Sequence, residues 1–144
     1  SYFDMQCCEI SIKYKRKKLQ MPPITDAKKV FELMKLIKDF RDNIDYIEMA
    51  YAIYLDNSCN TLGILKLSEG TINTCFMDTR KVFQGAILSN AKAFILVHNH
   101  PSGNLTFSEQ DRKVFKTFEK TGELMDIKLM DFLIISNNNY LSIK

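Results

Sequence analysis

The sequence contains very little histidine and no tryptophan: only two of its 144 residues are histidines. Both lie in one hexapeptide, which reads His98-Asn99-His100-Pro101-Ser102-Gly103. A metal site made of three histidines from one chain is therefore excluded. Any imidazole that acts as a base or as a metal ligand must come from this segment.

Paired cysteines and long apolar runs are also missing. None of the four cysteines forms a C-x-x-C pair, which excludes a zinc ribbon and a thioredoxin-like motif. Without a disulfide framework, a reducing cytoplasm is the expected compartment. The longest uninterrupted apolar run covers residues 49–55, far too short to span a membrane, and the N-terminus lacks the apolar region of a signal peptide. We therefore expect a cytoplasmic protein with no membrane contact.

The net charge is +3, from 20 basic and 17 acidic residues, and it is concentrated near the N-terminus. Residues 1–20 carry five basic and two acidic side chains, so the remaining 124 residues are balanced at 15 of each sign. A short basic run can contact DNA or an acidic partner, although a solvated strand end explains it equally simply. The basic side chains of this run are Lys13, Lys15, Arg16, Lys17 and Lys18.

The apolar fraction of 46% and the charged fraction of 26% are typical of a globular protein, and the length indicates one domain. We expect residues 1–24 to form a short N-terminal strand and basic segment, and residues 25–144 to form the main domain. Strands interleaved with helices predict an α/β or α+β domain with a mixed sheet and helices packed against it. Alternating residues and apolar runs predict strands at 8–14, 47–55, 61–67, 71–76, 93–97, 127–135 and 140–143, with a turn at 69–70. Helical spacing predicts helices at 26–40, 82–90 and 108–122.

His98 and His100 follow a strand that is apolar throughout, as expected for a strand covered on both faces. In extended backbone, residues two apart point to the same side, so both imidazoles can converge on one ion. Ser108 and Asp111 share one face of the next predicted helix. If that helix returns to the strand end, Asp111 supplies a third ligand. Two histidines and one carboxylate leave a fourth position for water, as in catalytic zinc sites.

Two other interpretations of this segment are open. The pattern from Ser108 to Asp111 also fits a helix-capping motif, which explains both residues without a metal. A zinc deaminase is a further alternative, but those enzymes need H-x-E and P-C-x-x-C motifs, and no cysteine here has that spacing. The conjunction of the two histidines with the spaced serine and aspartate favours the metal site.

The pattern of His98-x-His100, seven residues, Ser108, two residues and Asp111 resembles the signature of the JAMM (MPN+) zinc metalloprotease family. The longer string from His98 to Gly103 is similar to the RadC-like branch of that family. The resemblance covers about residues 8–144. It also includes the following flanking residues: Glu48, Gly70, Thr71, Arg80 and Asp131.

The resemblance implies a cytidine-deaminase-like JAB/MPN fold that holds one zinc ion. His98, His100 and Asp111 match the family's zinc ligands, and Ser108 matches the serine that helps to stabilise the tetrahedral intermediate. Glu48 matches the family's general acid/base, and amide hydrolysis needs a group that passes the proton of water to the leaving nitrogen. Ala50 and Ala52 share the face of Glu48 and leave room for a pocket.

The sequence thus predicts a zinc metallohydrolase that cleaves an amide in a peptide or protein substrate. The "DNA repair" label of the RadC-like family suggests the alternative of a DNA-associated accessory protein with a vestigial or non-peptidase zinc site.

The chain departs from the RadC-like pattern in two ways. Phe132 follows Asp131, where the pattern usually has histidine. This position is not a zinc ligand in the family, but a polar contact near the ligands or the substrate is put in doubt. Many relatives also carry an N-terminal helical, DNA-binding-like region. Only 24 residues precede the predicted main domain here, so we expect that region to be missing from this chain.

Overall fold

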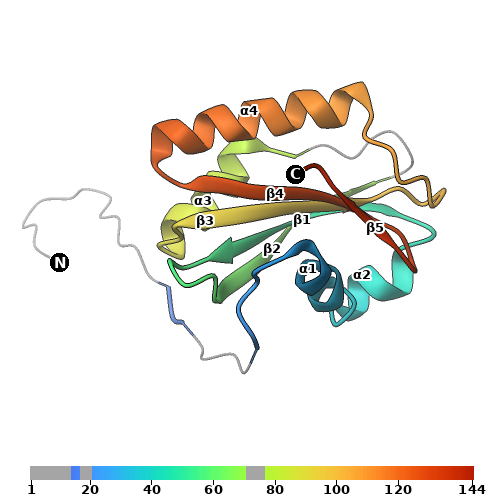
Figure 1. Ribbon diagram of the computed structural model, residues 1–144, viewed down its shortest axis with the longest axis horizontal. Coiled ribbons are helices and arrows are strands. Elements are labelled where there is room, and N and C mark those ends of the chain that lie inside the picture. The colour runs from blue at the N-terminus through green and yellow to red at the C-terminus, as the bar shows by residue number, and fades with distance from the viewer. Residues whose placement is uncertain (1–13, 17–20, 71–76) are drawn as a thin grey trace, which may run out of the picture.

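The computed structural model of the chain describes residues 14–16, 21–70 and 77–144 and shows a mixed sheet with helices on both faces (Figure 1). The strand order is β2-β1-β3-β4-β5. Among the strands of the described residues, only β3 and β4 pair in parallel, whereas β1 is antiparallel to both β2 and β3, and β5 is antiparallel to β4. This confirms the predicted α+β class. The strands are β1 (Glu48–Leu55), β2 (Thr61–Gly70), β3 (Ala93–Asn99), β4 (Lys128–Ile135) and β5 (Tyr140–Ser142).

One face of the sheet is covered by α1 (Ala27–Met34) and α2 (Lys38–Asn43) (Figure 1). Asp26 caps α1, as predicted, because its side chain accepts a hydrogen bond from the backbone N–H of Lys29. The core on this face is almost entirely aliphatic or aromatic. Phe40, for example, is fully buried and packs edge-on against Tyr51 with ring centroids 5.5 Å apart.

The opposite face is covered by α3 (Thr79–Leu88) and α4 (Glu109–Met125) (Figure 1). Here β1 contributes the small side chains of Ala50 and Ala52, and rings from β3 and the two helices fill the space above them. Three of these rings pack against one another, with centroids 5.4 Å apart for Phe83 and Phe94, 6.3 Å for Phe94 and Phe118, and 6.1 Å for Phe83 and Phe118.

The connection from β3 to β4 runs through α4 and brings the start of this helix to the end of β3. Ser108 is the N-cap, as predicted, but the predicted helix end at Gly122 is wrong. The helix continues to Met125 and ends at Asp126, which adopts the left-handed conformation. Gly122 instead allows the backbone of Ile127 to lie close to α4, because a Cβ atom at position 122 would collide with the backbone carbonyl of Ile127.

Two other sequence predictions are wrong. The predicted helix over 26–40 is interrupted at 35–37, although the apolar spacing continues across the break. After the break, Phe40 packs against Tyr51. The predicted turn at 69–70 is part of β2, where Gly70 pairs with Glu48.

Some predictions lie outside the described residues. They include the strand over 71–76 and all of the 8–14 strand except Tyr14, which is not in a strand. Within the described ranges, no helix is long and apolar enough to cross a membrane.

Candidate metal centre

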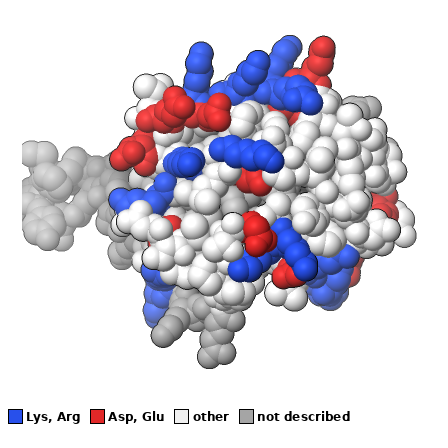
Figure 2. All heavy atoms as spheres, in the orientation of Figure 1, with Lys and Arg blue, Asp and Glu red and all other residues white. Residues whose placement is uncertain are grey.

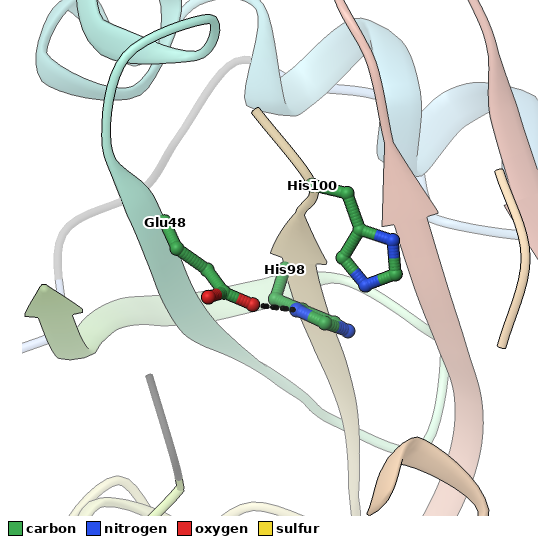
Figure 3. Close-up of side chains that lie close together, drawn as sticks. All are labelled: Glu48, His98 and His100. Carbon is green, nitrogen blue, oxygen red and sulfur yellow. Dashed lines mark ion pairs between the residues drawn. The ribbon is translucent and has the colours of Figure 1, made fainter. Parts of the chain in front are cut away.

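Polar side chains from three elements meet where β1 begins and β3 ends. Ala50 pairs with His98 in the antiparallel ladder, so Glu48, two residues earlier on β1, lies on the same face of the sheet as His98. Figure 3 shows the Glu48 side chain pointing toward His98, with the ring of His100 beside them. The pairing of β1 with β3 therefore brings two histidines and a carboxylate together, although Glu48 lies 50 residues before His98 in the chain.

Glu48, His98 and His100 form a group that could hold a metal ion, because one ligand atom of each lies within 4.8 Å of the others. Oε1 of Glu48 is 3.6 Å from Nδ1 of His98, and both side chains are largely buried, with 12% and 7% exposed. The two imidazole centroids are 4.8 Å apart. Buried acidic and imidazole groups are rare without partners or a metal, so this arrangement is a candidate functional site.

Asp111 joins this cluster from the first turn of α4. Its Oδ1 lies 2.8 Å from Nε2 of His98, and its Oδ2 lies 3.5 Å from Nε2 of His100. The same carboxylate forms a capping box, because its Oδ2 accepts from the Ser108 N–H while the Ser108 hydroxyl accepts from the Asp111 N–H. The capping and metal interpretations of Asp111 are thus compatible, since the cap directs the carboxylate toward the histidines.

The pKa values of Asp111 and His98 reflect two influences, which are burial and the opposite charge of their neighbours. Burial alone would raise the pKa of Asp111, but the adjacent imidazoles of His100 and His98 hold it far below its usual range. Burial likewise opposes protonation of His98, but the carboxylates of Asp111 and Glu48 raise its pKa above the ordinary value of 6.5. In the absence of a metal ion, this arrangement favours the carboxylate form of Asp111 and the protonated form of His98.

His98 carries a buried nitrogen that has no hydrogen-bond partner among the described residues. Its Nε2 is close to Asp111, but the two atoms do not have the alignment of a hydrogen bond. A buried nitrogen in this state is costly, and native proteins seldom retain one without a reason. A cation held by both the imidazole nitrogen and the carboxylate would satisfy both groups, so the donor set of these residues fits a bound metal ion.

The tautomer of His100 also fits metal binding. Its Nδ1 lies 2.9 Å from the carbonyl oxygen of Asn104, and because a carbonyl only accepts, Nδ1 carries the proton. Nε2, which faces Asp111, then presents its lone pair to the cluster. Histidine ligands commonly donate their second N–H to a backbone carbonyl in this way.

Phe132 forms an apolar wall behind the cluster. Its fully buried ring lies 5.5 Å from the His98 ring and 5.7 Å from the ring of Phe107, measured between centroids. The polar contact that a histidine would offer here is therefore replaced by packing against His98.

The structure thus brings together all five residues named from the sequence: Glu48, His98, His100, Ser108 and Asp111. Sequence reasoning missed Asn99, which is fully buried between the two histidines and makes three hydrogen bonds on the opposite face of the sheet. The sequence feature that could have identified Asn99 is a polar residue at the end of an otherwise apolar strand.

The predicted basic segment is only partly described. Arg16 forms an ion pair with Asp56, with 3.0 Å between nitrogen and oxygen. Lys13, Lys17 and Lys18 lie outside the described residues. Figure 2 shows Lys and Arg side chains interspersed with Asp and Glu on the face in view. DNA binding by the basic segment stays a prediction.

A helix-flanked mixed sheet with a His-x-His pair at the end of a central strand defines a domain of the JAB class. Residues 24–144 match the family model described as the RadC-like JAB domain, and the chain belongs to that family. This confirms the resemblance seen in the sequence.

Curated relatives come from diverse bacteria and carry the name "UPF0758 protein". The protein from Finegoldia magna is 41% identical over 98 residues, which are 68% of this chain and 44% of the relative. The Flavobacterium johnsoniae protein is 33% identical over 124 residues, 86% of this chain and 52% of the relative. The Thermotoga maritima protein is 37% identical over 97 residues, 67% and 44% respectively. The chain spans about half the length of these relatives, and their shared name specifies no reaction.

Proposed function

We propose that this chain is a zinc-dependent hydrolase that cleaves an amide bond in a peptide or protein. His98, His100 and Asp111 are the zinc ligands in this proposal, and a single zinc ion is the cofactor. The observation that carries it is the buried Nε2 of His98, which lacks a hydrogen bond and lies 2.8 Å from Asp111. The four cysteines of the sequence show no disulfide framework, which is typical of proteins in a reducing compartment and supports a cytoplasmic location.

The donor set favours zinc over harder cations. Two imidazole nitrogens and one carboxylate oxygen suit zinc, whereas calcium and magnesium prefer oxygen ligands alone. When bound, zinc lowers the pKa of a coordinated water and polarises a substrate carbonyl. The protein holds its donors on the end of a central strand and the first turn of a helix, so they are rigidly placed before the ion arrives.

Glu48 is assigned the role of proton carrier. Its Oε1 lies 3.6 Å from Nδ1 of His98, and one of its oxygens is within 4.8 Å of a ring nitrogen of His100, so the carboxylate lies beside two of the proposed ligands. A carboxylate beside the ligands can accept the proton of the attacking water and deliver it to the leaving nitrogen. The small side chains of Ala50 and Ala52 follow Glu48 on this face of β1.

Ser108 is assigned the stabilisation of the oxygen that becomes negatively charged when water adds to the carbonyl. Its hydroxyl oxygen accepts from the Asp111 N–H, so the hydroxyl proton is left for an outside acceptor. Ser108 is exposed at the start of α4, where an incoming substrate can reach it. Hydrogen-bond donors fixed at such a position typically contribute a large part of catalysis.

The proposal is tested by measuring zinc affinity against a chromogenic chelator and hydrolysis of a broad peptide library by the zinc-loaded protein. We expect tight, stoichiometric binding of one zinc ion and hydrolysis that chelation abolishes. His98→Ala and Asp111→Ala should lose zinc, whereas Glu48→Gln should keep zinc and lose hydrolysis. Zinc binding that survives His98→Ala would refute the assigned site, and zinc binding without hydrolysis of any library member would refute the reaction.

A further inference from the structure

Asn99 lies between the two histidines and faces the opposite side of the sheet. Its side chain is fully buried and makes three hydrogen bonds to the segment that leads into β1. Its amide nitrogen donates to the carbonyl oxygens of Ile44 and Ile47, at 2.7 and 2.8 Å, and its oxygen accepts from the N–H of Met49 at 2.7 Å. The side chain therefore holds both the turn before β1 and the first residues of that strand.

These bonds begin where the backbone ladder stops. Pairing between β1 and β3 ends at Ala50 and His98, and the next residues along β1, Met49 and Glu48, pair only with β2. The bond from Met49 to the Asn99 side chain takes the place of the next ladder bond to β3. The position of Glu48 relative to His98 is thus controlled on this side by Asn99.

We infer that Asn99 is a positioning residue, which fixes Glu48 against the imidazole of His98. The inference rests on the proposed function, in which Glu48 carries the proton. Alternate residues of an extended chain face opposite sides. The proposed ligands His98 and His100 therefore lie on one face of the sheet, whereas Asn99 holds the start of β1, which carries Glu48, from the other face. Misplacing a reacting group by about 1 Å commonly costs on the order of 100-fold in rate.

The experiment uses cobalt(II) in place of zinc in the full chain, because the visible spectrum of cobalt(II) reports its immediate surroundings. Asn99→Ala removes all three bonds, whereas Asn99→Asp keeps the acceptor for Met49 and removes both donations to the turn. Ser136→Ala is the matched control, since Ser136 is also buried, directly follows the neighbouring strand β4 and holds a turn through Asn139. Glu48→Gln supplies the reference for a lost carboxylate.

We expect Asn99→Ala to shift the cobalt(II) spectrum in the direction of Glu48→Gln, with Asn99→Asp intermediate and Ser136→Ala unchanged. Cobalt(II) affinity should stay within about threefold of the parent, because His98, His100 and Asp111 remain. With zinc and a library peptide that the parent cleaves, turnover by Asn99→Ala should fall on the order of 10- to 100-fold with little change in KM.

A second measurement does not depend on a metal. In the metal-free protein, Asn99→Ala should speed hydrogen exchange at the Met49 amide and leave the amides within β4 unchanged, which also shows that the variant is folded. A normal cobalt(II) spectrum in Asn99→Ala, together with a changed spectrum in Glu48→Gln, would overturn the positioning role alone. An unchanged spectrum in Glu48→Gln would overturn the proposed role of Glu48 and, with it, this inference.

Discussion

His98 and Asn99 are neighbours at the end of β3, and their side chains enter opposite faces of the sheet. Both are buried, with 5% and 0% of the residue exposed. The Asn99 amide uses its donors and its acceptor within the protein, whereas Nε2 of His98 has no hydrogen bond among the described residues. Asn99 is thus satisfied by neutral backbone groups, whereas Nε2 of His98 faces a carboxylate oxygen at 2.8 Å without the geometry of a hydrogen bond. A buried nitrogen in this state is the observation that favours a cation at this position.

The largest effect is expected when the two neighbours are replaced by leucine in the metal-free protein. Asn99→Leu leaves one N–H and two carbonyl groups without their partner, and should cost about 3 kcal/mol or more of the free energy of unfolding. His98→Leu leaves the largely buried carboxylates of Asp111 and Glu48 without the imidazole, and should also cost about 3 kcal/mol. Urea denaturation measures both values. A cost below about 1 kcal/mol for His98→Leu would show that its ion pairs with Asp111 and Glu48 contribute little to stability.

Zinc should widen the difference in stability between the parent and His98→Leu. A ligand that binds only the folded state stabilises it by about 2.7 kcal/mol when its concentration is 100 times the dissociation constant. We expect zinc to raise the Tm of the parent and of Ser136→Ala, and to leave that of His98→Leu unchanged. Calorimetry with and without a chelator gives the comparison. An equal rise in His98→Leu would place the zinc ion elsewhere.

Two substitutions of Ser108 distinguish its role as the cap of α4 from its proposed catalytic role. Ser108→Ala removes the acceptor for the Asp111 N–H and should cost about 1 kcal/mol of stability. Ser108→Asp keeps a capping acceptor but has no hydroxyl proton to donate, so it should restore stability and not peptide hydrolysis. Thermal denaturation and hydrolysis of the same library peptide test the two roles. Full hydrolysis by Ser108→Asp would leave Ser108 as a cap only.

The smallest effect is expected at an exposed ion pair on the α1/α2 face. Lys66 lies 2.6 Å from Asp39 and, with a hydrogen bond from Tyr51, lowers the pKa of Asp39 below its ordinary value of 3.8. A lowered pKa stabilises the fold above pH 3.8, and this contribution is lost as the pH falls through the lower folded-state value. Asp39→Asn should cost less than about 1 kcal/mol at pH 7, because the pair is exposed.

The control for this exposed pair is a urea titration repeated at low pH. The difference between Asp39→Asn and the parent should shrink as the pH falls below 3.8. A difference that stays constant down to pH 2 would show that Asp39 contributes through packing and not through its charge.

The sequence was sufficient to predict the sheet, the cap at Ser108 and the cluster of ligands, because these depend on local patterns. Alternation placed His98 and His100 on one side of β3, and helical spacing placed Asp111 beside Ser108. The break at 35–37 could not be predicted, since the apolar spacing of a single helix continues through it, and the packing of Phe40 against Tyr51 beyond the break is a contact between residues of different elements.

Predictions that required knowledge of long-range partners also failed. Glu69 and Gly70 look like a turn until Glu48 is known to pair with Gly70. Gly122 looks like a helix end until the carbonyl of Ile127 is seen against it. The role of Asn99 depends on the same kind of knowledge, because its three partners lie more than 45 residues earlier in the chain.

The parallel pairing of β3 with β4 has a consequence for synthesis on the ribosome. The last residue of the His-x-His…Asp motif is Asp111, but α4 packs against β4, which ends at residue 135. A nascent chain that has just released Asp111 therefore contains every residue of the candidate metal site but lacks β4, against which α4 packs. Because the cluster depends on these tertiary contacts, its geometry can form only after β4 has paired with β3.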